Sequence, residues 1–342
     1  MDQDKQAAGR AVLGGMHRRR FLALAGGMAG ATILAACGST GTATDMPRPA
    51  NSVATAPAAA TTASNVPSIA SPVRATTTPG SAVAGAPSTG GLPAMVIEAF
   101  DYGYRSLGSV PAGPTRIQLK NGGKEDHHAQ FLLLNPGVSL AQVDAALQKG
   151  SDGADGLLTY AGGPGGTAPG GSAEVILDLK EGQYLLACFL RGADHLPHFA
   201  KGMRMPLTVA TPTASAPPTP AVNGMITMFD FNFTMPDTLP ASRSLYTVTN
   251  TGAQYHEFGI GRLLPGKTAD DFKTFFDPAA RGGPPPGVPT GGMQALTRGA
   301  SGIVVLDLTP GDYVALCSVP DQSKPQGEAH AHLGMVRGFT VR

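Results

Sequence analysis

Apolar residues alternate with other residues in many short runs after residue 93, and this pattern predicts β-strands. Tyr184, Leu186 and Cys188 alternate with their neighbours, so we expect them on one face of a strand. The apolar runs 174–179 and 183–190 are separated by Glu-Gly, which predicts a β-hairpin. Together the runs indicate an all-β protein built from antiparallel strands.

Two segments depart from this alternation and have helical character, at about 140–148 and 269–276. Ser139 and Thr268 precede them and are predicted to cap their first turns. The loops that follow are rich in Gly and Pro, at 162–171 and 282–292. We therefore expect two Greek-key β-sandwiches of about seven or eight strands, each with one short helix.

The two parts of the chain after residue 93 repeat one another. Asn, His, Cys, a second His and Met recur in the same order, and the first His and the Cys are 61 residues apart in both copies. Most matching positions are offset by 129 residues, and after the Cys the offset rises to 132 because a loop is three residues longer in the second copy. The matching segments are 121–127 with 250–256, 177–188 with 306–317, and 198–203 with 330–335. Duplication of one domain explains this order at nearly fixed spacing.

Low-complexity segments divide the chain. Gly (46) and Pro (30) are frequent and charged residues make up only 14%, which suits strands joined by many turns plus flexible linkers. Ala, Thr, Ser, Pro and Gly dominate residues 38–92, so we expect this segment to be a disordered tether. The expected parts are a signal peptide at 1–36, the tether at 37–92, a first domain at 93–210, a linker at 211–222 and a second domain at 223–342.

The first 36 residues have the features of an export signal. Arg18-Arg19-Arg20-Phe-Leu is followed by an apolar run that is too short and too rich in Gly and Ala for a membrane span. The paired arginines resemble a twin-arginine signal, and Leu-Ala-Ala-Cys37 resembles a lipobox, which implies lipid attachment at Cys37. We therefore expect an exported bacterial lipoprotein, anchored to the membrane on its extracytoplasmic (periplasmic) face. An ordinary cleaved signal is the alternative, and translation could start at Met1 or at Met16.

The charge balance excludes one class of partner. The net charge is +1, but the leader carries five of the 25 basic residues and two of the 24 acidic ones, so the rest of the chain has a net charge of −2. No basic cluster remains, which argues against a nucleic-acid partner. Three cysteines are also too few for a scaffold held together by disulfides.

Each copy has one His on a mid-domain strand, one Cys at the end of a late strand, and then a His and a Met on the following loop. The endings are the most specific part, because four residues separate this His from the Met and Leu-Thr-Val or Phe-Thr-Val follows. The arrangement resembles the cupredoxin family, the plastocyanin- and azurin-like blue copper domains, over about 93–210 and 223–342. The resemblance implies two tandem cupredoxin-like domains with one copper ion each, since two imidazoles, a thiolate and a weak axial thioether form a blue-copper site. The implied ligands are His127, Cys188, His198 and Met203 in the first copy and His256, Cys317, His330 and Met335 in the second.

The spacing between the Cys and the second His departs from the family pattern. Nine residues separate Cys188 from His198 and twelve separate Cys317 from His330, whereas small blue copper proteins have only a few there. Other histidines leave the ligand set open, namely His128, His195 and His332. A Cys188–Cys317 disulfide is a further alternative in an oxidising compartment, although it would require equivalent strand ends of the two domains to face each other.

These residues are compatible with three candidate functions, which differ in how well the sequence supports them. The first is single-electron transfer to a redox partner protein by a membrane-tethered copper protein whose loop histidine offers an exposed edge. The second is a cell-envelope binding module that is metal-free or sequesters copper. The third, a two-domain copper oxidase or nitrite reductase, is disfavoured because those enzymes typically contain a Cys-His dipeptide, whereas here Phe189 follows Cys188 and Ser318 follows Cys317. No hydrolase motif occurs either, so we do not expect an enzyme.

Overall fold

The computed structural model describes residues 91–107, 110–212, 215, 217–280, 283–324 and 327–342, which fall within one compact unit. The predicted export signal, the lipid-attachment residue Cys37 and nearly all of the predicted tether lie outside the described residues. Within the described part of the chain, no helix has the length and apolar character needed to cross a membrane.

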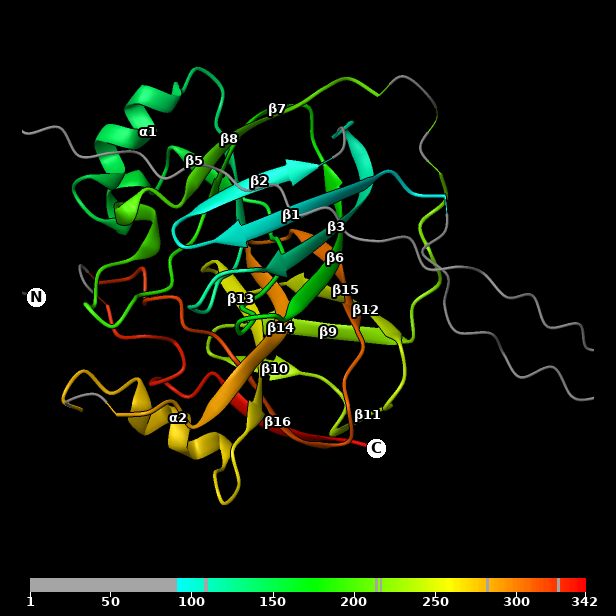
Figure 1. Cartoon of the computed structure of the whole chain (residues 1–342), viewed down its shortest axis with the longest axis vertical. Coiled ribbons are helices and arrows are strands. Elements are labelled where there is room, and N and C mark those ends of the chain that lie inside the picture. The colour runs from blue at the N-terminus through cyan, green and yellow to red at the C-terminus, as the bar shows by residue number, and fades with distance from the viewer. Residues whose placement is uncertain (1–90, 108–109, 213–214, 216, 281–282, 325–326) are drawn as a thin grey trace, which may run out of the picture. The chain divides into compact units, whose positions relative to one another are not determined.

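The first half is a β-sandwich (Figure 1). One of its sheets has the strand order β2-β1-β3-β6, with β1 and β3 parallel, and the other has the order β5-β4-β7-β8. The elements are β1 (Ala94–Phe100), β2 (Gly103–Leu107), β3 (Gly113–Asn121), β4 (Gln130–Leu134), α1 (Leu140–Leu147), η1 (Ser151–Ala154), β5 (Leu158–Tyr160), β6 (Ser172–Leu179), β7 (Gly182–Ala187), η2 (His198–Lys201) and β8 (Arg204–Val209).

The second half repeats this topology with one additional short strand, β11 (Thr238–Leu239), at the edge of its second sheet. Its sheets have the orders β10-β9-β12-β15 and β11-β17-β16-β13-β14, with β9 and β12 again parallel. The elements are β9 (Gly224–Phe229), β10 (Asn232–Thr234), β11 (Thr238–Leu239), β12 (Ser244–Asn250), β13 (His256–Leu263), α2 (Ala269–Phe275), β14 (Gly287–Leu296), β15 (Ser301–Leu306), β16 (Gly311–Leu316) and β17 (Val336–Val341). The predicted all-β fold of two Greek-key sandwiches, each with one short α-helix, is therefore confirmed.

The α-helices begin where the sequence predicts. Ser139 and Thr268 are the N-cap residues, and the backbone N–H of Gln142 donates to the Ser139 hydroxyl at 3.3 Å. In the second half the N–H of Thr268 donates to the carboxylate of Asp271 at 2.8 Å. These contacts satisfy donors that would otherwise lack partners in the first turn of the helix.

The predicted hairpin between 174–179 and 183–190 is wrong. β6 pairs with β3 and with β15, whereas β7 pairs with β4 and β8 in the opposite sheet. The Glu-Gly turn therefore carries the chain from one sheet to the other. A two-sheet arch and a hairpin share the same local signals, namely two apolar runs and a glycine turn, so the sequence does not separate them.

The two halves are joined through one continuous eight-stranded sheet, because β6 of the first half pairs antiparallel with β15 of the second (Figure 1). Val175 lies opposite Val304, its own counterpart in the repeat, and Ile176 lies opposite Ile303. A pairing centred on two equivalent residues is isologous, as in a twofold-symmetric dimer. The duplicated halves thus associate through the same strand of each.

The Gly/Pro-rich loops reinforce this junction in symmetric pairs of hydrogen bonds. The N–H of Gly162 donates to Ala295 O at 2.9 Å, and the equivalent bond runs from Gly291 to Gly166 at 2.8 Å. The N–H of Gly165 donates to Gly292 O at 3.0 Å, and its equivalent runs from Gln294 to Gly163 at 2.8 Å. The prediction of a loop at 282–292 is therefore partly wrong, since residues from Gly287 onward belong to β14. Its glycines allow a close backbone approach that larger residues would prevent.

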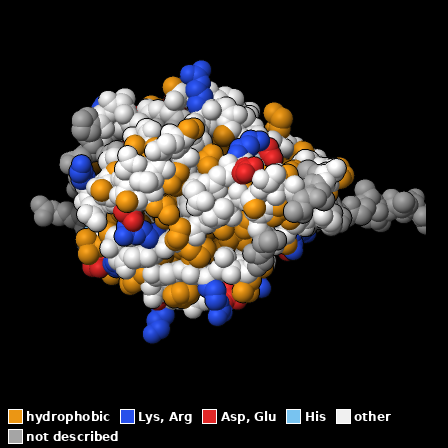
Figure 2. Space-filling view, turned by 90° about the horizontal axis from the view of Figure 1, so that it is seen from above, with side chains coloured by type: hydrophobic (Ala, Val, Ile, Leu, Met, Phe, Trp, Pro, Cys, Tyr) orange, Lys and Arg blue, Asp and Glu red, His pale blue; other side chains and the backbone are white. Residues whose placement is uncertain are grey.

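The described surface gives no sign of a broad basic area on the face shown in Figure 2. Lys and Arg side chains there lie singly or beside acidic side chains, and apolar side chains are scattered between them. The absence of a nucleic-acid partner remains a prediction. The domain boundaries also remain predictions, although β8 ends at Val209 and β9 begins at Gly224.

Candidate metal centres

In the first half, three predicted ligands converge at one end of the sandwich. His127 precedes β4, Cys188 follows β7, and His198 opens the short helix η2. The Nδ1 atoms of His127 and His198 are 3.2 Å apart, and Cys188 Sγ is 3.5 Å from His198 Nδ1. The ligand atoms of all three residues lie within 4.8 Å of one another. Met203 is fully buried and its N–H donates to His198 O at 2.9 Å.

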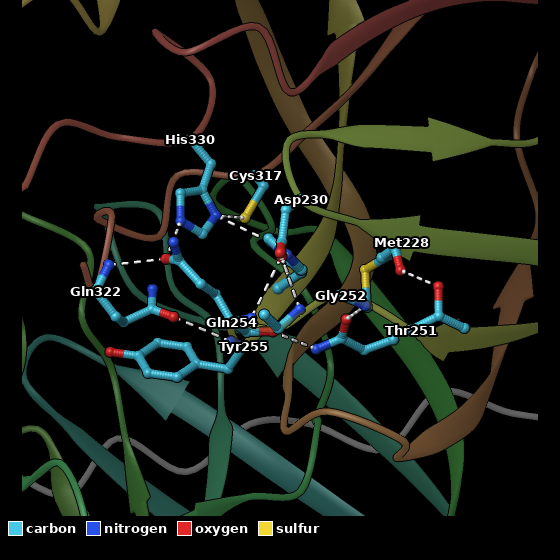
Figure 3. A network of polar contacts seen from close by, with 12 residues as sticks. Met228, Asp230, Thr251, Gly252, Gln254, Tyr255, Cys317, Gln322 and His330 are labelled. Carbon is cyan, nitrogen blue, oxygen red and sulfur yellow. Dashed lines mark hydrogen bonds and ion pairs between the residues drawn. The ribbon is translucent and has the colours of Figure 1, made fainter. Parts of the chain in front are cut away.

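The second half builds the same group (Figure 3). His256 Nδ1 is 3.0 Å from His330 Nδ1, and Cys317 Sγ is 3.3 Å from His330 Nδ1. The N–H of Met335 donates to His330 O at 2.8 Å, as Met203 does in the first half. His256, Cys317, His330 and Met335 are all fully buried. The two histidines and the cysteine of the predicted set are thus brought together in both halves.

The long spacing between Cys and the second His does not disturb this geometry, because the additional residues form a side loop closed at its neck. The N–H of His198 donates to Leu190 O at 2.8 Å, and the N–H of His330 donates to Val319 O at 2.8 Å. The residues beyond the neck, 191–197 and 320–329, therefore add length without moving the histidine. The three additional residues of the second copy lie in this side loop.

Acidic and amide side chains orient all four histidines. His127 Nε2 bonds to Asp101 Oδ1 at 2.6 Å, and His256 Nε2 bonds to the equivalent Asp230 Oδ1 at 2.7 Å. The remaining contacts are His198 Nε2 to Glu125 Oε2 at 2.8 Å and His330 Nε2 to Gln254 Oε1 at 3.0 Å. Such partners fix the ring orientation of metal-binding histidines and raise their basicity. The sequence analysis did not identify these four residues. Their signal was that Asp101 and Asp230, like Glu125 and Gln254, occupy equivalent positions of the repeat.

This arrangement directs the lone pairs of two imidazole nitrogens toward the centre of each group. A carboxylate only accepts, so a histidine beside it carries its proton on Nε2 and presents the Nδ1 lone pair to the centre. The Oε1 of Gln254 already accepts the N–H of Gln322 at 2.8 Å, so it accepts from His330 in the same way. Two Nδ1 lone pairs about 3 Å apart repel each other unless a cation or proton lies between them.

The donor set fits a soft or borderline metal ion. Ligand atoms at about 2.0–2.3 Å from a trigonal metal are themselves about 3.5 Å apart. The Sγ–Nδ1 distances of 3.5 and 3.3 Å are close to this value, and the Nδ1–Nδ1 distances of 3.2 and 3.0 Å are somewhat shorter. Two imidazoles and a thiolate are the trigonal donors of a blue-copper centre. The two histidines and the cysteine of each half therefore fit copper.

Burial shifts the pKa values of both thiols and of the loop histidines toward their uncharged forms. Burial raises the pKa of the Cys188 thiol to about 12 and holds that of the Cys317 thiol well above its usual range. Burial, followed by the neighbouring His256, lowers the pKa of His330 to about 4, and burial with His127 lowers that of His198. Metal binding at either centre must therefore release a thiol proton.

The other histidines lie outside the two groups. His128 accepts the N–H of Phe189 at Nε2, His195 is exposed, and His332 Nδ1 lies 3.1 Å from Lys273 O. The alternative disulfide does not form, because Cys188 and Cys317 are both free and buried. Within the described residues, only two groups of three or more metal-binding side chains occur.

One expectation about the loop histidine is wrong. His198 is only 1% exposed and His330 is fully buried, so neither offers a free edge to solvent. The Tyr102 ring lies 5.0 Å from the His198 ring, and the Phe231 ring lies 4.9 Å from the His330 ring. These aromatic rings pack against the histidines, and the repeat alone did not indicate this.

A buried asparagine anchors the loop before each first histidine. The Asn121 amide donates to Glu125 O and Thr167 O, both at 2.8 Å, and its oxygen accepts the N–H of Gly123. We expect Asn121→Ala to lower the free energy of unfolding by about 3 kcal/mol, because three hydrogen bonds are lost and buried carbonyls lose their donor. Urea denaturation checks this value.

The matched control is Asn232→Ala, since Asn232 is exposed and accepts a single hydrogen bond, from Phe233 N–H. It should cost less than about 1 kcal/mol. Equal losses in the two variants would show that Asn121 does not hold the loop.

His128 should make the metal-free protein acid-sensitive. Burial lowers its pKa to about 3, whereas an unfolded chain has a histidine pKa of about 6.5. Between these values the unfolded state binds a proton that the folded state does not, so stability falls as the pH falls, by up to about 1.4 kcal/mol per pH unit. His128→Gln should flatten the dependence of the urea midpoint on pH between 6.5 and 3. An unchanged slope would contradict this assignment.

The comparisons with known proteins come from solved structures alone, because no family model and no curated protein matches the chain. A reduced auracyanin from the photosynthetic bacterium Roseiflexus castenholzii is 25% identical and covers 35% of this chain and 99% of its own, with a TM-score of 0.24. Auracyanin B is 16% identical over 36% of this chain and 91% of its own, with a TM-score of 0.23. A multicopper oxidase is 18% identical over 75% of this chain and 93% of its own, with a TM-score of 0.22. The all-β sandwich fold of this chain rests on its own strand order.

Proposed function

We propose that this cupredoxin-like chain binds one copper ion in each half and transfers single electrons, and that it does so while tethered through Cys37 on the extracytoplasmic face of a bacterial membrane. The observation that supports copper binding is the convergence of two Nδ1 atoms and one Sγ atom in both halves. The same donor set arises twice from separate segments. A chance grouping in one core is therefore a poor explanation.

The protein's own residues would hold the metal in a fixed, dry environment. His127, Cys188 and His198 would bind it in the first half, with Met203 nearby, and Asp101 and Glu125 would hold the imidazoles in place. Copper, when bound, supplies a one-electron change between Cu(I) and Cu(II). Strands hydrogen-bonded on both sides resist movement, so the ligands change little between the two states. Burial excludes water and other ligands.

Copper sequestration is a second candidate, and the burial of all six His and Cys residues favours it. A closed site exchanges metal slowly and would keep copper from reacting elsewhere. A copper-oxidase activity is not proposed, because those enzymes use additional copper centres and the described residues contain only the two groups. The membrane tether rests on the leader sequence alone.

Loading the purified protein with Cu(II) tests the proposal. We expect two copper ions per chain by elemental analysis and strong visible absorption from thiolate-to-copper charge transfer. Ascorbate should bleach the band and an oxidant should restore it. Two bound copper ions whose visible band does not respond to reductant would favour sequestration, and copper bound without a visible band would refute both the site and the transfer function.

A further inference from the structure

The two halves differ at one position that contacts the second histidine of each centre. His198 Nε2 bonds to the Glu125 carboxylate at 2.8 Å, whereas His330 Nε2 bonds to the Gln254 amide oxygen at 3.0 Å. Glu125 and Gln254 are equivalent residues, offset by 129. One ligand histidine therefore faces a carboxylate and its counterpart faces a neutral amide.

The residues around this position change with it. Tyr102 in the first half donates its hydroxyl to Glu125 Oε1 at 2.7 Å and accepts from Lys201 Nζ at 3.2 Å. Its counterpart Phe231 has no hydroxyl and packs its ring against His330. In the second half the Gln254 amide instead donates to Asp321 Oδ1 at 2.8 Å (Figure 3). Each environment is thus built to hold its own side chain in place.

The primary geometry of the two centres is closely matched, although the Tyr104 hydroxyl interacts with Cys188 and its counterpart Phe233 has no hydroxyl. Asp101 and Asp230 bond to the first histidines at 2.6 and 2.7 Å. The Nδ1–Nδ1 distances are 3.2 and 3.0 Å, and the Sγ–Nδ1 distances are 3.5 and 3.3 Å. Position 125/254 therefore distinguishes two centres with nearly the same primary geometry.

A carboxylate and an amide have different effects on a metal-bound imidazole. A carboxylate that accepts the Nε2–H draws the proton more strongly and makes Nδ1 a better donor. A stronger donor stabilises Cu(II) more than Cu(I), because the ion of higher charge gains more from it. Reduction of that copper then becomes harder.

We propose that Glu125 and Gln254 are positioning residues that tune the reduction potentials of the two copper centres in opposite directions. Glu125 holds the first potential lower than a glutamine would, and Gln254 leaves the second higher than a glutamate would. The inference rests on the proposed copper function. The halves also differ at His128 and Glu257, which bond to the residue after the cysteine, and this second difference stays constant in the test below.

The test exchanges the two residues in full-length chains that keep a single copper centre. Glu125→Gln is made in a Cys317→Ser background and Gln254→Glu in a Cys188→Ser background, and each potential is measured by spectroelectrochemical titration of the visible band. We expect Glu125→Gln to raise its potential and Gln254→Glu to lower its own. Each change should alter the ratio of reduced to oxidised copper about tenfold at a fixed applied potential, which is about 59 mV for a one-electron couple.

Tyr102→Phe provides an independent variant should Glu125→Gln fold poorly. It removes a donor from Glu125 and leaves that carboxylate a stronger acceptor for His198, so the first potential should fall. Potentials that stay unchanged, or that move in the same direction in the two exchanges, would overturn the inference. Absence of any Cys-dependent band in the parent chain would instead refute the proposed function.

Discussion

Cys188→Ser is expected to abolish the visible absorption of the first copper centre and leave that of the second intact. The charge-transfer band requires a thiolate ligand, and a serine hydroxyl neither ionises readily nor absorbs in the visible range. Copper per chain should fall from two to one, because His127 and His198 lose the sulfur donor that lies 3.5 Å from His198 Nδ1. Cys317→Ser should do the same to the second centre, and the double variant should be colourless.

Two control variants separate a ligand effect from general damage. Met225→Leu removes the sulfur of a residue that is 64% exposed, and His195→Gln removes an exposed imidazole outside both groups. Neither should alter the copper count or the spectrum. If Cys188→Ser keeps the full absorption of the parent chain, the first half does not contribute a copper–thiolate centre.

Gly163→Ala is expected to destabilise the protein by more than about 4 kcal/mol or to prevent folding. A methyl group at Gly163 would lie 1.9 Å from Ala129 O, and the backbone φ of +140° is poorly accessible to alanine. Gly292, the counterpart of Gly163, has the same restriction, with Phe258 O at 2.0 Å. Each clash is with a segment of the same half, and because the carbonyl oxygens of both glycines accept hydrogen bonds from the other half, moving the glycine would also strain the junction.

Gly170→Ala and Gly299→Ala are the matched controls. These two residues are also counterparts and have φ of +76° and +78°, but nothing lies within 4 Å of an added methyl group. In these variants the free energy of unfolding should fall only by the cost of placing alanine in a left-handed backbone conformation, about 1–2 kcal/mol. Urea denaturation of the four variants gives the comparison, and a loss at Gly163 no greater than that at Gly170 would contradict the close approach of Gly163 to Ala129.

The internal repeat made the candidate site predictable. Two copies of a His, Cys, His and Met order pointed to His127, Cys188, His198 and Met203 and to their counterparts, and the structure brings the His and Cys members together in both halves. The helix starts were also predictable, because capping is a local interaction. The role of the long side loops was not, since closure at Leu190 and Val319 depends on backbone bonds that no residue type signals.

The features that escaped prediction depend on contacts between distant segments. The turn after β6 has the local signals of a hairpin, yet β6 pairs with β15, about 130 residues further along the chain. The burial of His198 and His330 depends on Tyr102 and Phe231, which lie far from them in sequence. Glu125 and Gln254 gave a visible signal, because they are the acidic and amide members of equivalent positions, but only the geometry shows that they contact the histidines.

The most direct test of the two copper centres is X-ray absorption at the copper K-edge on the wild-type chain loaded with two equivalents of copper. We predict a first shell of two nitrogen ligands and one short sulfur ligand per copper. The sulfur contribution should be halved, relative to the nitrogen shell, if only one cysteine binds the metal. A shell of nitrogen and oxygen alone would mean that neither Cys188 nor Cys317 binds copper, in which case the two buried groups are part of the packing of the sandwiches.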